Sequence, residues 1–209
     1  MLIGIFKLGK TLMAKNRSSK TQNKQSGQIR IIAGQYRGRK LPVIMAPGLR
    51  PTTDRVKETV FNWLMPYLYQ ANCLDCFAGS GSLGFEALSR GVTASCFYEL
   101  NSAAAQQIQL NIQLLKADNA KVVKGSCLEL LNREQQAFDL VFIDPPFRQG
   151  FVGQTAHLLE TKNLLSDAAI IYIEAESELA ELAIPNNWQL LKEKVAGQVA
   201  YRLYQRKSS

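Results

Sequence analysis

The chain has 209 residues, of which 46% are hydrophobic and 20% charged, so it is too apolar to be disordered throughout and long enough for one well-cored domain with an appendage. Its net charge of +8 is compatible with a polyanionic partner but identifies none. The distribution is more informative: residues 1–58 hold thirteen Lys or Arg and two acids, a net charge of +11, and the rest of the chain carries −3. A basic N-terminal quarter on a nearly neutral body is typical of a nucleic-acid-facing arm.

Residues 1–26 begin with a short apolar stretch that Lys7 and Lys10 interrupt. The stretch is too short for the core of a signal peptide, and no membrane-spanning run follows anywhere in the chain. We expect a disordered basic tail on a soluble, cytoplasmic protein without a membrane partner. Met13 offers an alternative start of translation, in which case the first twelve residues are not part of the protein.

Residues 27–50 change character and alternate apolar and polar side chains around Gly34 in "GQIRIIAGQYRGRKLPV". This pattern predicts a β-hairpin. The cations Arg37, Arg39 and Lys40 cluster at its tip or edge.

The next segment, "LRPTTDRVKETVFNWL", predicts a helix. Thr52 or Thr53 can cap it, Asp54 lies in its first turn, and an apolar face follows at helical spacing. Arg50 and Arg55 extend the basic surface towards the body, although solvated charges on a helix face are common.

From Asn72 onward, strand-like and helix-like segments alternate, and several strands are apolar throughout. Such strands are typical of a parallel sheet with helices on both faces. Residues 188–206 instead contain two strand-like runs around Gly197 and predict a closing antiparallel hairpin. We therefore expect residues 51–209 to form an α/β domain of the Rossmann-like type, with a mostly parallel seven-stranded sheet, a C-terminal antiparallel hairpin and a small N-terminal hairpin and helix extension.

The motif "CLDC" invites a metal or redox interpretation, which we do not favour. Cys73 and Cys76 are three residues apart in a predicted strand, so their side chains point to opposite faces. No second CxxC completes a zinc site, and buried, unreactive thiols are the usual outcome. The single histidine, His157, has no nucleophile at a useful spacing, so we expect neither a metal nor a Ser-His or Cys-His mechanism.

A glycine motif follows the first strand of the body in "DCFAGSGSLG". Gly79, Gly81 and Gly84 form a GxGxxG at a strand-to-helix turn, and Glu99 ends the next strand, where its carboxylate can bind ribose hydroxyls. NAD and S-adenosylmethionine both fit this pattern. Asp75 favours S-adenosylmethionine, because a carboxylate near the strand end suits the ammonium group of its methionine and repels a pyrophosphate.

The motif "FIDPPF" closes the fourth strand of the body, beside the glycine loop. The two prolines fix the backbone, so the Asp144 carboxylate and the Pro145 carbonyl can point to one place, and Phe147 offers a ring for stacking. Two acceptors and an aromatic plate suit an exocyclic amino group on a planar base. The alternative is a plain strand-terminating turn, but the glycine loop, Glu99 and DPPF occur in the order that a single site requires.

Together, "GQIRIIAGQYRGRKLP", "LRPTTDRVKETVFNWL", "LDCFAGSGSLG", "FIDPPF" and "EKVAGQVAYRLYQR" resemble the bacterial small-subunit ribosomal RNA guanine-N2 methyltransferases of the D type, a class I S-adenosylmethionine-dependent family. The resemblance runs from about Gly27 to Lys207. It implies methylation of the N2 amine of one guanine in small-subunit ribosomal RNA, in an assembled or partly assembled subunit, by a monomer.

The resemblance also implies residue roles. The base is expected at Asp144, Pro145 and Phe147. The cofactor S-adenosylmethionine is expected at Asp75, Phe77, Gly79, Gly81, Glu99 and Asn101, with Ser126 and Cys127 beside its adenine. The RNA is expected at Arg37, Arg39, Lys40, Arg50 and Arg55. The pair Ser126–Cys127 departs from the wider fold, in which an acid is often found at that position.

Three alternatives remain open from the residues themselves. DPPF-type motifs also serve DNA adenine methyltransferases, and only the family resemblance selects RNA. A nicotinamide-dependent oxidoreductase shares the glycine loop but leaves DPPF and the basic arm unexplained. A non-catalytic RNA-binding assembly factor explains the arm but not the site.

Overall fold

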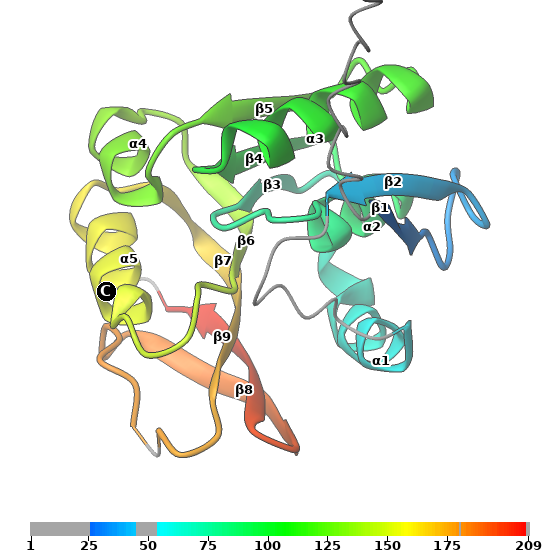
Figure 1. Cartoon of the computed structure of the whole chain (residues 1–209). Coiled ribbons are helices and arrows are strands. Elements are labelled where there is room, and N and C mark those ends of the chain that lie inside the picture. Colours follow the sequence, from blue (N-terminus) through cyan, green and yellow to red (C-terminus); the bar gives the residue numbers. More distant parts are fainter. Residues whose placement is uncertain (1–25, 45–53, 180, 208–209) are drawn as a thin grey trace, which may run out of the picture.

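The computed structural model describes residues 26–44, 54–179 and 181–207 (Figure 1). The tail expected at 1–26 lies outside this part except for Ser26, and so do Arg50 and the cap candidates Thr52 and Thr53. Within the described residues, no helix is long and apolar enough to cross a membrane.

A seven-stranded sheet forms the centre of the described structure, with the strand order β5-β4-β3-β6-β7-β9-β8 (Figure 1). Its strands are β3 (Asn72–Asp75), β4 (Ala94–Glu99), β5 (Ala120–Lys124), β6 (Phe138–Ile143), β7 (Leu165–Glu176), β8 (Trp188–Ala196) and β9 (Val199–Arg206). The first five strands in this order pair in parallel, β9 is antiparallel to β7, and β8 is antiparallel to β9. The predicted fold class is therefore confirmed, including the C-terminal hairpin.

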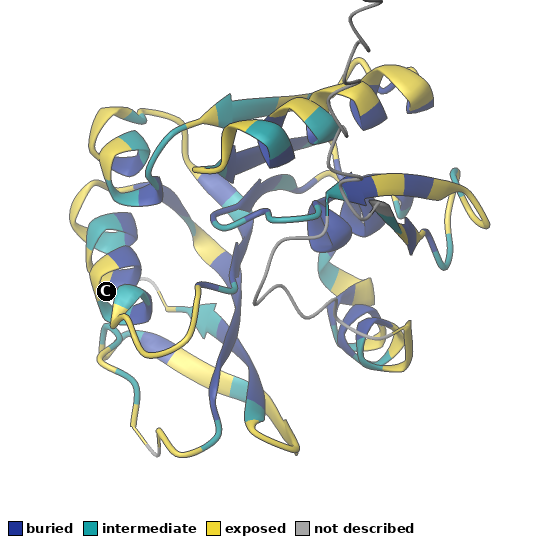
Figure 2. Ribbon diagram, in the orientation of Figure 1, coloured by how far each residue is buried: buried dark blue, intermediate teal, exposed yellow. Residues whose placement is uncertain are grey.

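Helices cover both faces of the sheet, which explains why its strands are apolar on both sides (Figure 2). One face packs against α1 (Asp54–Leu64), the short 3-10 helix η1 (Met65–Tyr67), α2 (Ser82–Ser89) and α3 (Ser102–Leu115). The other packs against α4 (Cys127–Arg133) and α5 (Phe151–Thr161). Cys73 belongs to the first core and Cys76 to the second, so the two thiols lie on opposite faces, as the alternation predicts.

A separate antiparallel hairpin, β1 (Ser26–Arg30) and β2 (Lys40–Ile44), precedes the sheet and confirms the predicted strand pair. Its apolar residues Ile29, Leu41 and Val43 share one hydrophobic core with α1 and α2. The division into an arm at 27–50 and a body at 51–209 stays a prediction, but the described parts of both are packed into a common core.

A buried polar joint fixes the turn of this hairpin to α2. Glu86 of α2 accepts hydrogen bonds from the backbone N–H groups of Ile32 (2.8 Å) and Ala33 (3.1 Å). The same carboxylate lies 2.7 Å from Arg90 Nε and 3.6 Å from Nζ of Lys57, a residue of α1 that is only 2% exposed. Burial lowers the pKa of Lys57 below its ordinary 10.5, although Glu86 opposes this. Lys57, one of the thirteen cations of residues 1–58, is therefore an internal residue.

Ser89, one turn beyond Glu86, completes the joint. Its hydroxyl donates to the Ala33 carbonyl at 2.6 Å and accepts from the backbone N–H of Tyr36 at 2.9 Å. The turn approaches so closely at Gly34, where φ is +84°, that a Cβ atom there would lie 1.8 Å from the Ser89 carbonyl oxygen. Only glycine fits this position.

Candidate functional site

The sequence-predicted site residues of the body meet at the carboxyl edge of the sheet. The chain runs from β3 outward to β4 and β5, and β6 then returns to the other side of β3. The strand order thus reverses between β3 and β6, which is where open α/β sheets bind ligands. The glycine loop leaves β3 and the DPPF segment leaves β6, so the structure brings both motifs to this switch point.

The glycine loop turns sharply between β3 and α2. β3 ends at Asp75, earlier than the sequence suggests, and Gly79 (φ +52°) and Gly81 (φ +75°) adopt left-handed conformations. A Cβ atom at Gly81 would lie 2.7 Å from the Phe85 ring, and one at Gly84 would lie 2.3 Å from the Phe97 ring. The first two glycines therefore shape the turn, and the third allows α2 to pack closely on the sheet.

Glu99 holds the glycine loop in place from the end of β4. Its two carboxylate oxygens accept hydrogen bonds from the backbone N–H groups of Gly79 (2.7 Å) and Asn101 (2.6 Å). The side chain of Asn101 caps α3 by accepting from Ala103 and Ala104. Leu100, which sequence reasoning missed, is 70% exposed next to Glu99 and offers an apolar surface beside the carboxylate.

Asp75 is buried behind the glycine loop. Its carboxylate accepts from the backbone N–H of Gly84 at 3.1 Å. Burial raises its pKa to about 7, the hydrogen bond from Gly84 opposes this rise, and the neighbouring carboxylates of Asp144 and Glu99 add to it. A cation placed beside such a carboxyl group lowers its pKa and favours its ionised form.

The DPPF segment puts two kinds of group at the same edge. Asp144 is half-buried, and burial of its carboxyl group raises its pKa to about 7. Pro145 is buried, whereas Phe147 is 40% exposed despite its large ring. A carboxyl group that titrates near pH 7, that of Asp144, and the exposed aromatic ring of Phe147 therefore lie three residues apart in the chain.

Two further acids lie on β7, beside DPPF, and sequence reasoning missed both. Glu174 is buried, accepts a hydrogen bond from the Tyr172 hydroxyl at 2.8 Å, and has its pKa raised to about 9 by burial and by the Asp144 carboxylate. Glu176 accepts from the backbone N–H of Arg148 and so ties down the segment after DPPF. The sequence does mark these two acids, because charged residues rarely interrupt a buried apolar strand such as "AAIIYIEAE" without a partner.

The remaining predicted cofactor residues differ in exposure. The Phe77 ring packs against Phe151 at the start of α5, with ring centroids 5.8 Å apart. Ser126 is the half-buried residue before α4, and its side chain makes no capping bond. Cys127, the first residue of α4, is buried in the second core, and its thiol lies close to that of Cys76.

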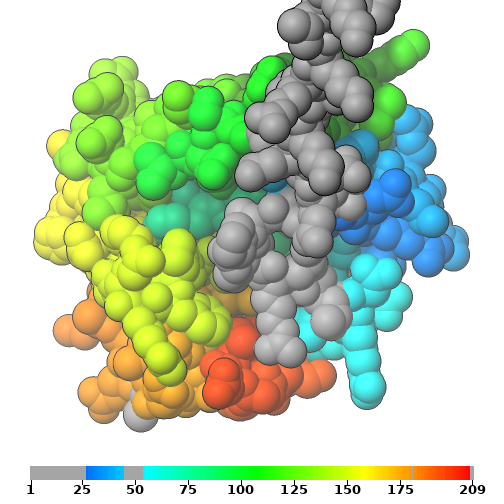
Figure 3. All heavy atoms as spheres, in the orientation of Figure 1, coloured from blue at the N-terminus to red at the C-terminus, as the bar shows by residue number. Residues whose placement is uncertain are grey.

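The predicted RNA-contacting cations that the structure describes lie on the hairpin and on α1. Arg37, Arg39 and Lys40 are all exposed, and the guanidinium of Arg39 donates to the Leu114 carbonyl at 3.2 Å. Arg55 is exposed on α1. In Figure 3 the residues that follow β6, in yellow-green, lie next to the orange and red C-terminal strands on one face of the molecule.

Comparison with known families matches residues 29–205 to the family described as conserved hypothetical protein 95. The chain is 54% identical to Ribosomal RNA small subunit methyltransferase D of Escherichia coli (strain K12) over 189 residues, which are 90% of this chain and 96% of that protein. It is also 54% identical over 183 residues to the protein of that name from Haemophilus influenzae, covering 86% of this chain and 94% of the relative.

Among solved structures, the methyltransferase yhhF from Escherichia coli has a TM-score of 0.81 and 55% identity, and the match covers 88% of this chain and all of that chain. The family match spans most of the sequence, and both relatives align over nearly their whole length. This chain therefore belongs to the conserved hypothetical protein 95 family, as a close relative of the Ribosomal RNA small subunit methyltransferase D proteins.

Proposed function

We propose that the protein transfers a methyl group from S-adenosylmethionine to the exocyclic amine, N2, of a guanine in small-subunit ribosomal RNA. The observation that carries this proposal is the meeting of the glycine loop and the DPPF segment at the switch point of the sheet. The names of the two relatives support methyl transfer to RNA of the small subunit.

The residues around the glycine loop fit S-adenosylmethionine. Gly79 and Gly81 allow the backbone to approach a ligand closely, and the Glu99 carboxylate lies beside them to accept the ribose hydroxyls. The exposed Leu100 can pack against the adenine ring. Asp75 suits the methionine ammonium, because a positive charge would stabilise its ionised form and lower the raised pKa.

The DPPF residues act on the guanine. Asp144 and the Pro145 carbonyl accept the two N–H bonds of the amine, which draws its lone pair out of conjugation with the ring, and Phe147 holds the base by stacking. Bound S-adenosylmethionine supplies the electrophilic methyl group, so that a nitrogen–carbon bond forms as the carbon–sulfur bond breaks and S-adenosylhomocysteine is left. The methylated nitrogen then carries one proton too many, which the Asp144 carboxylate, with its pKa near 7, can accept.

Substrate recognition is assigned to the exposed cations of the N-terminal hairpin. Counterion release makes phosphate contacts depend on salt, so replacing the three residues Arg37, Arg39 and Lys40 by alanine should weaken RNA binding and flatten its dependence on log salt by up to about 0.7 per lost contact. Binding of S-adenosylmethionine should stay unchanged, because the glycine loop does not contact these side chains. A triple variant with wild-type affinity and salt slope would move recognition to another surface.

A methyl-transfer experiment with several substrates tests the proposal. Purified protein and tritiated S-adenosylmethionine are incubated with small subunits, free small-subunit RNA and whole ribosomes from cells lacking the gene, and with duplex DNA. We expect label in ribosomal RNA, most of it with assembled or partly assembled subunits, and none in DNA. Label in DNA adenine would replace the proposal with the alternative methyltransferase, and no label in any nucleic acid would remove methyl transfer altogether.

A further inference from the structure

A groove between α1 and the C-terminal hairpin β8–β9 has no part in the chemistry described above. Its volume is about 250 Å³, and its walls come from one helix and one strand pair. The residues lining it are Arg55, Val56, Thr59, Val60 and Trp63 of α1 and Lys194, Ala196 and Tyr201 of the hairpin.

Strand register places this groove close to the candidate site. Ile143 pairs with Ile173, so the next residues, Asp144 and Glu174, follow at the same level of the sheet edge. The raised pKa of Glu174, to which the Asp144 charge contributes, agrees with this proximity. Continuing across the sheet, Glu174 pairs with Tyr201.

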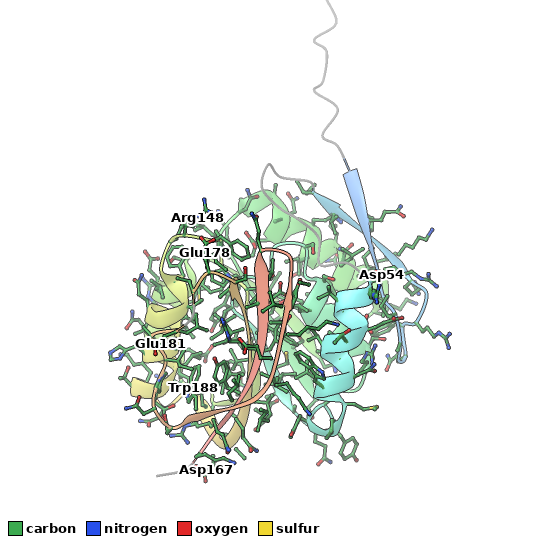
Figure 4. All side chains as sticks on the ribbon, turned by 90° about the horizontal axis from the view of Figure 1, so that it is seen from below. Asp54, Arg148, Asp167, Glu178, Glu181 and Trp188 are labelled. Carbon is green, nitrogen blue, oxygen red and sulfur yellow. The ribbon has the colours of Figure 1, made fainter. Side chains whose placement is uncertain are left out.

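Tyr201 in turn pairs with Lys194 on β8. Because neighbouring strands lie about 4.8 Å apart, Tyr201 is about 10 Å and Lys194 about 14 Å from Asp144 along the same edge. In Figure 4, Arg148, which follows DPPF, and Asp54, which starts α1, lie on opposite sides of the C-terminal strands, both in the upper half of the view, and Trp188 lies in the lower half. The groove therefore opens beside the candidate site.

The chemistry of the lining is that of a nucleotide site. Arg55 and Lys194 are exposed cations on opposite walls, and Trp63 is a half-buried aromatic ring between the apolar residues. Glu193, next to Lys194, is engaged by Arg202 at 2.7 Å and is not available to neutralise the lysine. Paired cations and an aromatic surface bind single-stranded nucleic acid without sequence preference, through phosphate contacts and stacking.

We propose that this groove binds a nucleotide of the RNA substrate that flanks the target guanine, with its phosphate between Arg55 and Lys194 and its base against Trp63. The inference rests on the proposed function. A guanine that reaches Asp144 must leave its stack, and holding the adjoining nucleotide in the groove offsets part of that unstacking. The groove thereby keeps the strand open at the candidate site.

Kinetics with a charge-matched control test the proposal. We compare Arg55→Ala/Lys194→Ala with Lys116→Ala/Lys162→Ala, which removes two exposed lysines at the C-terminal caps of α3 and α5, the ends that face away from the carboxyl edge. With unmethylated small subunits we expect the groove variant to raise KM for RNA about tenfold and to lower the salt slope by about 1.4, with kcat and S-adenosylmethionine affinity unchanged. Identical KM and salt slope in the two double variants would refute nucleotide binding in the groove. A wild-type protein without activity on any RNA would instead refute the proposed function itself.

Fluorescence gives a second readout that is independent of activity. The chain has two tryptophans, so Trp188→Phe leaves Trp63 as the reporter and Trp63→Phe leaves the buried Trp188. With saturating protein-free small-subunit RNA, we expect quenching in Trp188→Phe and little change in Trp63→Phe, with circular dichroism confirming both folds. Quenching confined to Trp63→Phe, or equal in both variants, would contradict stacking in the groove.

Discussion

Replacing Glu86 by glutamine should release the N-terminal hairpin from the body. The carboxylate, which is fully buried, is bound by Lys57, Arg90 and the backbone N–H groups of Ile32 and Ala33. Glutamine keeps the size but removes the charge and turns one acceptor into a donor. Breaking a buried ion pair costs about 3–5 kcal/mol, and a buried N–H left without an acceptor costs about 1–3 kcal/mol. The two effects overlap, so we expect the free energy of unfolding to fall by about 3–5 kcal/mol.

Two measurements on the Glu86→Gln protein check this expectation. Urea unfolding followed by circular dichroism gives the loss of stability. Limited trypsin digestion reports the hairpin itself, because Arg37 and Arg39 are exposed in the turn that Glu86 holds and become easier to cleave when the turn detaches.

Glu160→Gln is the matched control. Glu160 likewise accepts from several donors, Asn187, Trp188 and Arg206, but it connects α5 to the C-terminal strands. We expect it to lose stability without faster cleavage at the hairpin turn. If Glu86→Gln keeps the wild-type urea midpoint, or if both variants are cleaved equally at the turn, the buried joint does not hold the hairpin.

Three further predictions concern the carboxylates at the sheet edge. Asp144→Ala should lower the rate of methyl transfer about a hundredfold or more with little change in S-adenosylmethionine affinity, and the wild-type rate should rise with pH around 7 as Asp144 ionises. A near-normal rate of Asp144→Ala in single-turnover experiments would exclude the carboxylate from the mechanism. Glu99→Ala should weaken S-adenosylmethionine binding by about 1.5–3 kcal/mol in calorimetric titration, with NAD as the negative control, and unchanged affinity would make Glu99 only a clamp for the glycine loop. Because the folded-state pKa of Glu174 is raised to about 9, its stabilising contribution is complete below pH 4.5 and is lost as the pH rises through 9. The free energy of unfolding of Glu174→Gln, measured in urea, should therefore exceed that of the wild type by an amount that grows across this pH range, and a constant difference would contradict the assignment.

Much of the fold is predictable because its signals are local. The strands are continuous apolar runs, and the glycines at 79, 81 and 84 mark the turn after the first of them. The sequence does not predict the helix α4, since its seven residues carry too little periodicity. The apolar pattern extends β3 beyond its observed end at Asp75, because Cys76, Phe77 and Ala78 are as apolar as the strand before them.

The candidate site is predictable only where a residue type is unusual for its position. DPPF and Glu99 stand out at strand ends, whereas Glu86 looks like an ordinary acid on a helix face. Its partners, Lys57 and the backbone of Ile32 and Ala33, lie 29 to 54 positions away, and only the folded chain brings them together. Cys127 is buried, so its exposure marks no site, and its place beside the adenine stays a prediction.

The identity of the methylated nucleoside tests the central claim most directly. Small-subunit RNA is isolated from cells that lack the gene and carry either the wild-type protein or Asp144→Ala, digested to nucleosides and analysed by mass spectrometry. We expect one N2-methylguanosine per RNA molecule that is restored by the wild type and absent with Asp144→Ala. A different methylated nucleoside restored by the wild type, or full restoration by Asp144→Ala, would contradict it.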